Sequence, residues 1–292
     1  MKAAAFDYSR AGSVEEVCAL LARHGPDARL IAGGQSLVPM MAMRLVRPSV
    51  LVDIQRIASL HEWRVEQDFL CIRACVRQNV IEREAALSEA VPLLRKAIRW
   101  IGHVQTRNRG TVGGSLAHAD PSAELPLVAA TLGAQCVVRS SKDERTIPSA
   151  AFFTGPMSTA LQADECLVEI RLPIWHADRI GTSFEEVAIR HGDFALVAVA
   201  AQVALDPQGV CKRVALGVGG AAPAPVAFAD LANQLVGTRL EGAAIRAVAD
   251  TLAKQLDPMS DLHASTSYRR HLAHTLTMRT LAAARDEALA QS

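Results

Sequence analysis

The sequence predicts an α+β protein made of two successive regions that meet near residue 175. Before that point, short strand-like runs alternate with helical segments; after it, three consecutive strand-like runs precede three helical segments. Strands grouped before helices are typical of an α+β domain, so residues 176–292 are expected to form a separate domain. The 292 residues, half of them hydrophobic, suffice for two domains of ordinary size.

Residues 1–57 are expected to form the first subdomain of the region 1–175. The stretch Ser13–Gly25 predicts an amphipathic helix with a serine cap, a reciprocal glutamate and a glycine stop. Buried strands are expected at residues 28–32 and 49–54. Between them, Ser36–Arg44 favours a helical segment, because Pro39 falls in its first turn, where proline is tolerated.

Residues 58–175 are expected to form the second subdomain. The apolar patterns predict strands at 69–76, 134–140 and 164–173, and helices at 80–87, 92–103 and 125–133. The stretch 111–126 is rich in Gly, Ala, Ser and Pro, and we expect it to be irregular.

The region 176–292 is expected to contain a three-stranded antiparallel sheet followed by helices. Turn signals separate the strand-like runs at 182–189, 193–205 and 209–220. Helices are predicted near Ala227–Leu235, Gly242–Gln255 and Tyr268–Ala290.

The charge balance gives no sign of a nucleic-acid or anionic-membrane partner, because 31 basic residues face 30 acidic ones. The longest apolar stretch, Ala195–Leu205, is much shorter than the roughly 20 residues of a membrane span. The first residues lack the continuous apolar segment of a signal peptide. A soluble, cytoplasmic protein is therefore expected.

The six cysteines, at 18, 71, 75, 136, 166 and 211, show no C-x-x-C spacing. Two thiolates, such as Cys71 and Cys75, do not make a structural zinc or iron–sulfur site. Buried free thiols are the favoured interpretation, and no metal ligand is assigned to this chain.

Gly-Gly pairs follow strand-like runs at 33–34, 113–114 and 219–220. The third pair lies in Gly217–Ala222, which fits the dinucleotide pattern G-x-G-x-x-A. Pro223 and Pro225 follow at once and remove N–H groups from the helix start that this pattern needs. A strand-end turn is favoured there.

The second pair lies in "GGSLA", which approaches the hydrolase pattern G-x-S-x-G, with His118 and Asp120 nearby. That pattern needs a strand before the serine, and triad members normally come from separate segments. A serine hydrolase is disfavoured, and no catalytic residue is assigned.

The first two pairs together favour an anion site. Glycines let a ligand approach the backbone, and turns expose N–H groups. Gln35, Ser36, Thr111 and Ser115 add short polar side chains. Two such loops facing each other would hold the diphosphate of a dinucleotide.

Four stretches together carry a family resemblance: "AGGQSLVPMMAMRLVRPSVLVDI", "QTRNRGTVGGSLAHADPSAELP", "RHGDFALVAVA" and "YRRHLAHTL". From about Phe6 to Leu281 the chain resembles the FAD-binding medium subunit of the molybdenum hydroxylases, the xanthine dehydrogenase and carbon monoxide dehydrogenase group. The three-chain enzymes for small molecules, such as carbon monoxide, nicotine and caffeine dehydrogenases, are the most similar in kind.

The resemblance implies a PCMH-type FAD-binding domain, the vanillyl-alcohol-oxidase type, whose FAD lies between two α+β subdomains. It implies that the first loop wraps the FAD pyrophosphate, that Glu124 lies near the adenosine ribose and that Leu167 packs near the flavin or adenine rings. Asp120 would hold either its own loop or a cofactor hydroxyl. The implied cofactor-binding residues are Arg29, Leu30, Ile31, Ala32, Gly33, Gly34, Gln35, Ser36, Leu37, Ile101, Gly102, Thr111, Gly113, Gly114, Ser115, Ala117, His118, Asp120, Glu124 and Leu167.

The chain departs from this family at Glu185-Glu186, near where many members carry a lysine. A negative charge facing the flavin would disfavour its anionic reduced form, so these glutamates are expected to point away. Arg190 and Asp193 match an R-x-x-D pattern that suits an ion pair at a domain interface. The segment 268–271 is expected to serve helix packing and subunit contact.

The resemblance also implies partners: an iron–sulfur small subunit with [2Fe-2S] clusters and a large subunit with the molybdenum cofactor, in a dimer of heterotrimers. FAD on this chain would collect electrons from the iron–sulfur subunit and pass them to an external acceptor. The alternatives are a stand-alone flavin-dependent reductase on a related fold and, third, a non-enzymatic nucleotide-binding module.

Overall fold

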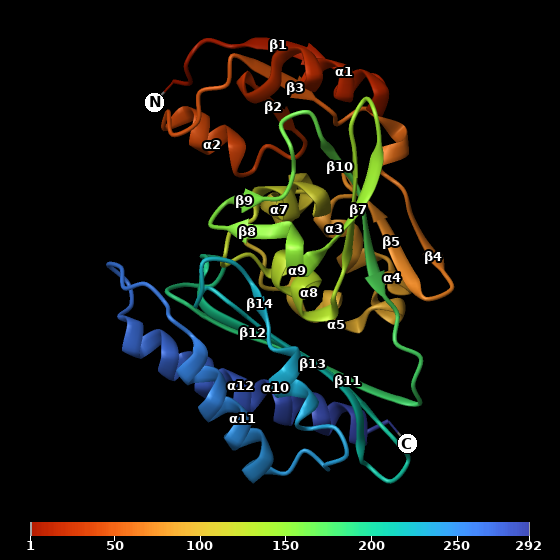
Figure 1. Cartoon of the computed structure of the whole chain (residues 1–292), viewed down its shortest axis with the longest axis vertical. Helices are drawn as coiled ribbons and strands as arrows, with labels where there is room; N and C mark the ends of the chain where they lie inside the picture. The colour runs from red at the N-terminus through yellow and green to blue at the C-terminus, as the bar shows by residue number, and fades with distance from the viewer. Residues whose placement is uncertain (1, 292) are drawn as a thin grey trace.

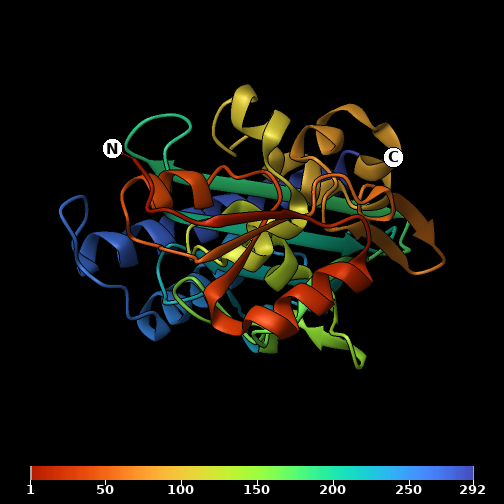
Figure 2. The ribbon, with the colours of Figure 1, turned by 90° about the horizontal axis from the view of Figure 1, so that it is seen from above.

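Three layers follow one another along the long axis of the molecule (Figure 1). The computed structural model describes residues 2–291. In this part of the chain a three-stranded, a five-stranded and a four-stranded sheet occur in chain order, with a short two-stranded hairpin beside the second. Seen from above, the first sheet and its helix lie across the middle of the molecule, and the two ends of the chain lie on opposite sides (Figure 2).

The N-terminal layer is a parallel sheet in the order β1-β3-β2. Its strands are β1 (Asp7–Arg10), β2 (Ala28–Ile31) and β3 (Val50–Asp53). Helix α1 (Val14–His24) begins at the predicted cap, since the Ser13 hydroxyl accepts from the N–H of Glu16 at 3.2 Å. The predicted helix at 36–44 is confirmed as the shorter α2 (Leu37–Ala42).

The middle layer is an antiparallel sheet in the order β4-β5-β10-β6-β7. The strands predicted at 69–76, 134–140 and 164–173 are β5 (Phe69–Arg73), β6 (Gln135–Arg139) and β10 (Cys166–Pro173). The sequence patterns missed β1 and the two edge strands, β4 (Trp63–Glu66) and β7 (Glu144–Pro148). They also missed α9 (Ser149–Phe152) and the hairpin of β8 (Phe153–Gly155) and β9 (Ser158–Thr159).

Two predicted helices of this layer differ in the structure. The helix expected at 80–87 is two helices, α3 (Gln78–Arg83) and α4 (Ala85–Ala90), because Glu84 between them adopts an extended backbone. The helix expected at 92–103 ends early, as α5 (Pro92–Ile98), and α6 (Val104–Arg109) follows.

The prediction that residues 111–126 are irregular is wrong. They contain α7 (Val112–His118) and the start of α8 (Glu124–Leu132). Glycine disfavours helices, but here Thr111 caps the helix and the N–H of Val112 donates to the carbonyl of Val76 at 2.9 Å. Packing on β5 thus overrides local propensity.

The C-terminal layer contains three long antiparallel strands, as predicted: β11 (Arg179–Ala188), β12 (Ala195–Leu205) and β13 (Cys211–Gly219). The expectation of three strands needs one correction, because a two-residue strand, β14 (Val226–Ala227), pairs with Gly217 and Val218. Helices α10 (Ala229–Asn233), α11 (Gly242–Gln255) and α12 (Thr266–Leu289) follow.

Strand β12 is buried over its whole length because helices cover both faces of its sheet. Valines such as Val199 join the core beneath α11 and α12, whereas Ala198 and Ala200 belong to a core that continues into the middle layer around α5 and α8. The middle and C-terminal layers therefore share one hydrophobic core. Among the described residues, no helix has the length and apolar character to cross a membrane.

Candidate cofactor site

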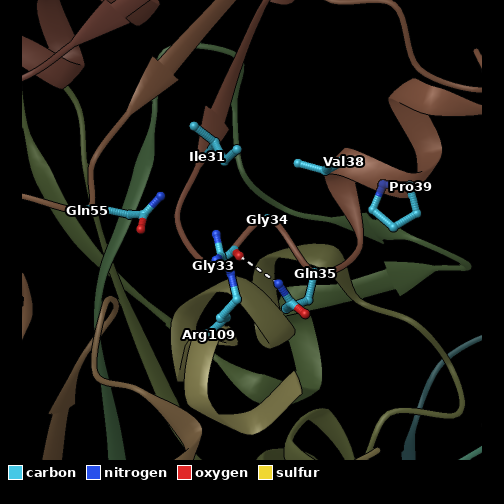
Figure 3. Close-up of a pocket in the computed structure, with 8 residues that line it drawn as sticks. All are labelled: Ile31, Gly33, Gly34, Gln35, Val38, Pro39, Gln55 and Arg109. Carbon is cyan, nitrogen blue, oxygen red and sulfur yellow. Dashed lines mark hydrogen bonds between the residues drawn. The ribbon is translucent and has the colours of Figure 1, made fainter. Parts of the chain in front are cut away.

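A cavity of about 310 Å³ lies where the loop after β2 meets the end of α6 (Figure 3). The first glycine loop and Arg109, the residue just before the second loop, therefore lie at one place in the fold. The residues that line the cavity are Ile31, Gly33, Gly34, Gln35, Val38, Pro39, Gln55 and Arg109.

The first loop, residues 32–36, leaves the carboxyl end of β2 and leads into α2. Gly34 has a φ of +70°, which lets the chain turn sharply there. The side-chain amide of Gln35 donates to the carbonyl of Gly33 at 3.1 Å and braces the turn. Within residues 2–291, the N–H groups of Gly33, Gly34, Gln35 and Ser36 have no hydrogen-bond acceptor. The loop thus offers unpaired N–H donors beside the cavity.

The second loop, residues 110–115, bonds every N–H group except that of Thr111 within the protein. Thr111 caps α7, and its hydroxyl accepts from the N–H of Gly114 at 3.1 Å. The N–H of Gly113 donates to Ala74 at 2.9 Å, and that of Ser115 donates to Thr111 at 3.1 Å. The free donors expected from this loop are therefore spent on anchoring α7 to the end of β5.

The two loops touch through backbone atoms. A Cβ built on Gly33 would lie 2.3 Å from the carbonyl oxygen of Arg109 and 2.9 Å from the Cα of Gly110. The same carbonyl accepts from the Nη1 of Arg77, whose Nη2 donates to Gln55 at 3.1 Å. Arg77 thereby ties the end of α6 to Gln55, two residues after β3.

Several residues predicted for the cofactor site lie near these contacts but do not line the cavity. The half-buried residues in or beside the first loop are Leu30, Ala32, Ser36 and Leu37. Ile101 and Gly102 form the turn before α6, where the guanidinium of Arg107 binds both carbonyls, at 2.8 and 3.1 Å. Arg107 is thus an anchor of this turn.

The other predicted residues are farther along the chain. Arg29 is exposed and its guanidinium bonds to the nearby carbonyls of Pro26 and Ala28. Ala117 is exposed and His118 half-buried in the last turn of α7. Leu167 is buried in the core of the middle layer.

Asp120 and Glu124 organise the start of α8. The Oδ1 of Asp120 accepts from the N–H of Ser122 at 2.9 Å, so Asp120 holds its own loop. Glu124 is the first residue of α8 and is only 8% exposed. Burial, and secondarily the charge of Asp120, raises the pKa of Glu124 to about 7.

The two glutamates of β11 point to opposite faces of their sheet. Glu185 pairs with Arg279 of α12 at 2.7 Å, on the side of the C-terminal helices. Glu186 is buried on the other side, and its Oε2 has no hydrogen-bond partner within residues 2–291. The two glutamates therefore differ in surroundings: Glu185 faces α12, whereas Glu186 turns into the interior.

The structure also shows the contacts of the R-x-x-D pattern, of Arg269 and of the cysteines. Arg190 and Asp193 form an ion pair at 3.2 Å on the loop between β11 and β12. Arg269 serves packing, since its guanidinium binds the carbonyl of Gly220 at 3.0 Å and Asp261 at 2.6 Å. All six cysteines are free and buried, as predicted.

The structure also agrees with the rejection of the dinucleotide pattern at 217–222 and of the hydrolase pattern around Ser115. Gly219 ends β13 and no helix begins until Ala229, so the third glycine pair lacks the helix that a dinucleotide loop needs. Ser115 lies within α7, not at a turn between a strand and a helix.

The sequence patterns missed four residues of the cavity wall: Val38, Pro39, Gln55 and Arg109. The position of Gln55 could have predicted it as a cavity residue. It comes shortly after β3, the parallel neighbour of β2, and the carboxyl ends of parallel strands meet at one edge of a sheet. Arg109 precedes the second glycine loop, and its guanidinium makes no ion pair within residues 2–291.

This wall fits the diphosphate of a dinucleotide. Unpaired N–H groups and one unpaired guanidinium supply donors for phosphate oxygens. Ile31, Val38 and Pro39 supply an apolar side. Among residues 2–291 no three His, Cys, Asp or Glu side chains gather as a metal site would require.

Comparison with known proteins decides which dinucleotide this fold is built for. Residues 4–175 match the model of the FAD binding domain in molybdopterin dehydrogenase, and residues 182–284 match that of the CO dehydrogenase flavoprotein C-terminal domain. This chain is a member of the molybdenum hydroxylase FAD-subunit family. It carries the FAD-binding domain of oxidoreductases, as the resemblance implied.

Relatives match along nearly the whole chain. The 6-hydroxypseudooxynicotine dehydrogenase complex subunit alpha of Paenarthrobacter nicotinovorans is 40% identical over 97% of this chain and 96% of its own. The caffeine dehydrogenase subunit beta of a Pseudomonas species is 37% identical over 98% and 97%.

Solved structures agree with this family in fold. The carbon monoxide dehydrogenase of Hydrogenophaga pseudoflava contains a chain that superposes with a TM-score of 0.95 at 32% identity, covering 99% of this chain and 100% of that one. Quinoline 2-oxidoreductase of Pseudomonas putida 86 contains one with a TM-score of 0.93 at 37% identity and the same coverage. The FAD-binding domain followed by a domain with an antiparallel sheet is thus the fold of this molybdenum hydroxylase subunit.

Proposed function

We propose that this chain is the electron-transfer subunit of a cytoplasmic molybdenum hydroxylase complex. It takes electrons from an iron–sulfur small subunit with [2Fe-2S] clusters and passes them to an external acceptor, while a molybdopterin large subunit oxidises the substrate. Bound FAD supplies the redox chemistry; the chain binds and orients it. The observation that carries the proposal is the cavity with unpaired N–H donors and Arg109, in a chain of this family.

The site residues divide by the part of FAD that they would hold. The N–H groups of residues 33–36 and the guanidinium of Arg109 would bind the pyrophosphate. The second loop, with Thr111, Gly113, Gly114 and Ser115, would form the opposite wall. Glu124 would lie near the adenosine ribose and Leu167 near the rings, as the resemblance implies.

The names of relatives support a subunit rather than a free enzyme. One relative is the medium chain of the carbon monoxide dehydrogenase of Hydrogenophaga pseudoflava, 33% identical over 96% of both chains. Another is the nicotine 6-hydroxylase medium subunit of Paenarthrobacter nicotinovorans, 36% identical over 96% of this chain. We extend this arrangement to a dimer of heterotrimers here.

Purification of the native complex through a tag on this chain tests the proposal. The expected result is co-purification of two further subunits with molybdenum, iron and FAD in fixed ratio. The reading would be wrong if the isolated chain, without partners, oxidised or reduced a carbon substrate with NAD(P)H at enzymatic rates. That outcome would favour a stand-alone flavin-dependent reductase instead.

A further inference from the structure

The side-chain amide of Gln55 points into the cofactor cavity, across from Val38 and Pro39 (Figure 3). Gln55 comes two residues after β3 and belongs to neither glycine loop. The N–H of Ile54, the preceding residue, donates to the carbonyl of Ile31 at 3.1 Å. This turn therefore lies against the end of β2, where the first glycine loop begins.

Two hydrogen bonds fix the backbone of Gln55. Its N–H donates to the Oδ1 of Asp53 at 2.8 Å, and its carbonyl accepts from the Nε2 of His61 at 2.7 Å. The buried carboxylate of Asp53 is itself held by the hydroxyl of Tyr8, which donates to its Oδ2. The turn that carries Gln55 is thus tied to β1, to β3 and to His61, and the side chain starts from a defined point.

Arg77 orients the side chain of Gln55. Its Nη2 donates to the Oε1 of Gln55 at 3.1 Å, and its Nη1 donates to the carbonyl of Arg109. A guanidinium carries only donors, so the oxygen of the amide must be the atom that faces it. The amide nitrogen, Nε2, is left at the cavity wall and has no acceptor within residues 2–291.

The charge of Arg77 strengthens this free donor. Arg77 makes no ion pair within residues 2–291, and Glu82 of the adjacent α3 is paired with Arg107 at 3.0 Å. A hydrogen bond from a guanidinium to the amide oxygen polarises the amide, which makes its N–H groups stronger donors. None of the residues that line the cavity is acidic. The wall therefore suits a ligand with anionic oxygens.

We propose that the amide nitrogen of Gln55 binds an oxygen of the FAD diphosphate, and that Arg77 is the positioning residue that leaves this nitrogen free for it. The proposal rests on the proposed function and adds two residues that the glycine-loop motifs do not include. Arg77 does not line the cavity itself, so it acts through the Oε1 of Gln55.

The variant Gln55→Glu separates binding from folding. Its carboxylate keeps the shape of the side chain and still accepts from Arg77, so the flavin-free full-length chain should unfold at the wild-type temperature or above. It has no N–H to donate and would repel phosphate, so the affinity for FAD should fall by more than about tenfold. Titration with FAD measures the affinity, and thermal unfolding measures the stability.

The matched control is Gln234→Glu, which makes the same change at the exposed end of α10 and should bind FAD like the wild type. Wild-type affinity for FAD in Gln55→Glu would overturn the proposal. Should Gln55→Glu fail to fold, Gln55→Ala tests the same donor, and its affinity for FAD should fall by about tenfold.

A double-variant cycle tests whether Arg77 acts through Gln55. Arg77→Met should weaken FAD binding by about tenfold when Gln55 is present, but by about threefold or less in the Gln55→Ala background. Arg83→Met, at an exposed arginine of α3, is the control. A merely structural role of Arg77 predicts equal losses in both backgrounds, and that result would contradict its positioning role.

Fragments of FAD test which part of the cofactor Gln55 binds. Gln55→Ala should weaken the binding of ADP, which carries the diphosphate, by the same factor as that of FAD. It should leave the binding of riboflavin, which carries no phosphate, unchanged. Competition with FAD measures both affinities. A greater loss for riboflavin than for ADP would reject the diphosphate as the ligand of Gln55.

Failure of this inference is distinguishable from failure of the proposed function. A wild-type chain that binds no FAD contradicts the proposed function, whatever the variants do. A wild-type chain that binds FAD, with equal affinity in Gln55→Glu and Gln234→Glu, contradicts only the inference.

Discussion

The first two glycine loops have similar sequences, "AGGQS" and "TVGGS", but use their backbones differently. The first leaves the N–H groups of residues 33–36 without acceptors, beside a cavity. The second bonds N–H groups to Ala74 and Val76, just after β5, and to its own cap, and it leads into the helix α7. The first loop thus offers unpaired donors, whereas the second is anchored to the rest of the fold.

The glycines themselves show why a Gly-Gly pair alone does not identify a ligand site. Gly33 lies against the carbonyl of Arg109, and Gly113 lies against the backbone of Ala74. Both exclude a side chain because protein backbone, rather than a ligand, occupies the space. The unpaired donors, not the missing Cβ atoms, distinguish the binding loop from its support.

The largest effect is expected for Gly33→Ala, because its Cβ would force the two loops apart. We expect a loss of roughly 1–3 kcal/mol in stability, as for overpacking elsewhere, and loss of FAD. Thermal unfolding and the flavin absorbance per chain measure both. Gly242→Ala is the control, since its Cβ would meet nothing within 4 Å. Native stability and full flavin content in Gly33→Ala would contradict the contact between the loops.

Gly113→Ala should lower stability by a similar amount, roughly 1–3 kcal/mol, since its Cβ would lie 2.6 Å from the Cα of Ala74. The loss should appear in the flavin-free chain as well, because Gly113 supports the fold. Denaturant unfolding with and without FAD distinguishes this from a ligand effect. A loss seen only with FAD present would make Gly113 a binding residue instead.

Arg109→Gln should weaken FAD binding by about tenfold or more, because hydrogen bonds to charged groups contribute about 1.5–3 kcal/mol. Its backbone carbonyl, which Gly33 and Arg77 contact, remains in place. Titration of the flavin-free chain with FAD gives the affinity, and Arg95→Gln, an exposed arginine of α5, is the control. An unchanged affinity would remove Arg109 from the site.

Gly114→Ala should cost about 1 kcal/mol, less than Gly113→Ala, since its Cβ would meet only the Thr111 side chain, at 2.6 Å from Oγ1. The expected loss is that of a helix cap. Thr111→Ala should reproduce it, and the double variant should add little. Additive losses in the unfolding experiment would show that Gly114 acts elsewhere.

Gln35→Ala should have the smallest effect on stability. It removes the brace on Gly33, a hydrogen bond of about 1 kcal/mol, and should weaken FAD binding by about fivefold. Gln35→Glu should bind FAD more weakly than Gln35→Ala, because its carboxylate cannot donate to the Gly33 carbonyl and would also repel phosphate. Tighter FAD binding in Gln35→Glu than in Gln35→Ala would contradict a pyrophosphate at this loop.

Periodicity predicted most of the fold. The apolar run of β12 and the amphipathic α1 are local patterns, and both were found where expected. The predictions failed where distant partners decide. Residues 112–118 form a helix whose first N–H groups bond to Ala74 and Val76, just after β5. The edge strand β7 pairs with β6 despite its polar sequence.

The sequence predicted only part of the cavity wall, because the tertiary fold brings its other residues together. The cavity is lined by Ile31, Gly33, Gly34 and Gln35, and their motif contains the signal. Gln55 and Arg109 reach the same wall only after the chain closes on itself. The alternation of a strand determined that Glu185 and Glu186 face opposite sides, but not which of them faces the interior.

The sequence by itself therefore determined most of the elements and the glycine positions, because these follow from local spacing, and it indicated the family through resemblance. The tertiary structure alone decided which N–H groups remain unpaired and which of the two glutamates on β11 is buried. The hydrogen-bond partners of a group and the dielectric around it depend on residues tens of positions away, and local sequence spacing does not reveal these.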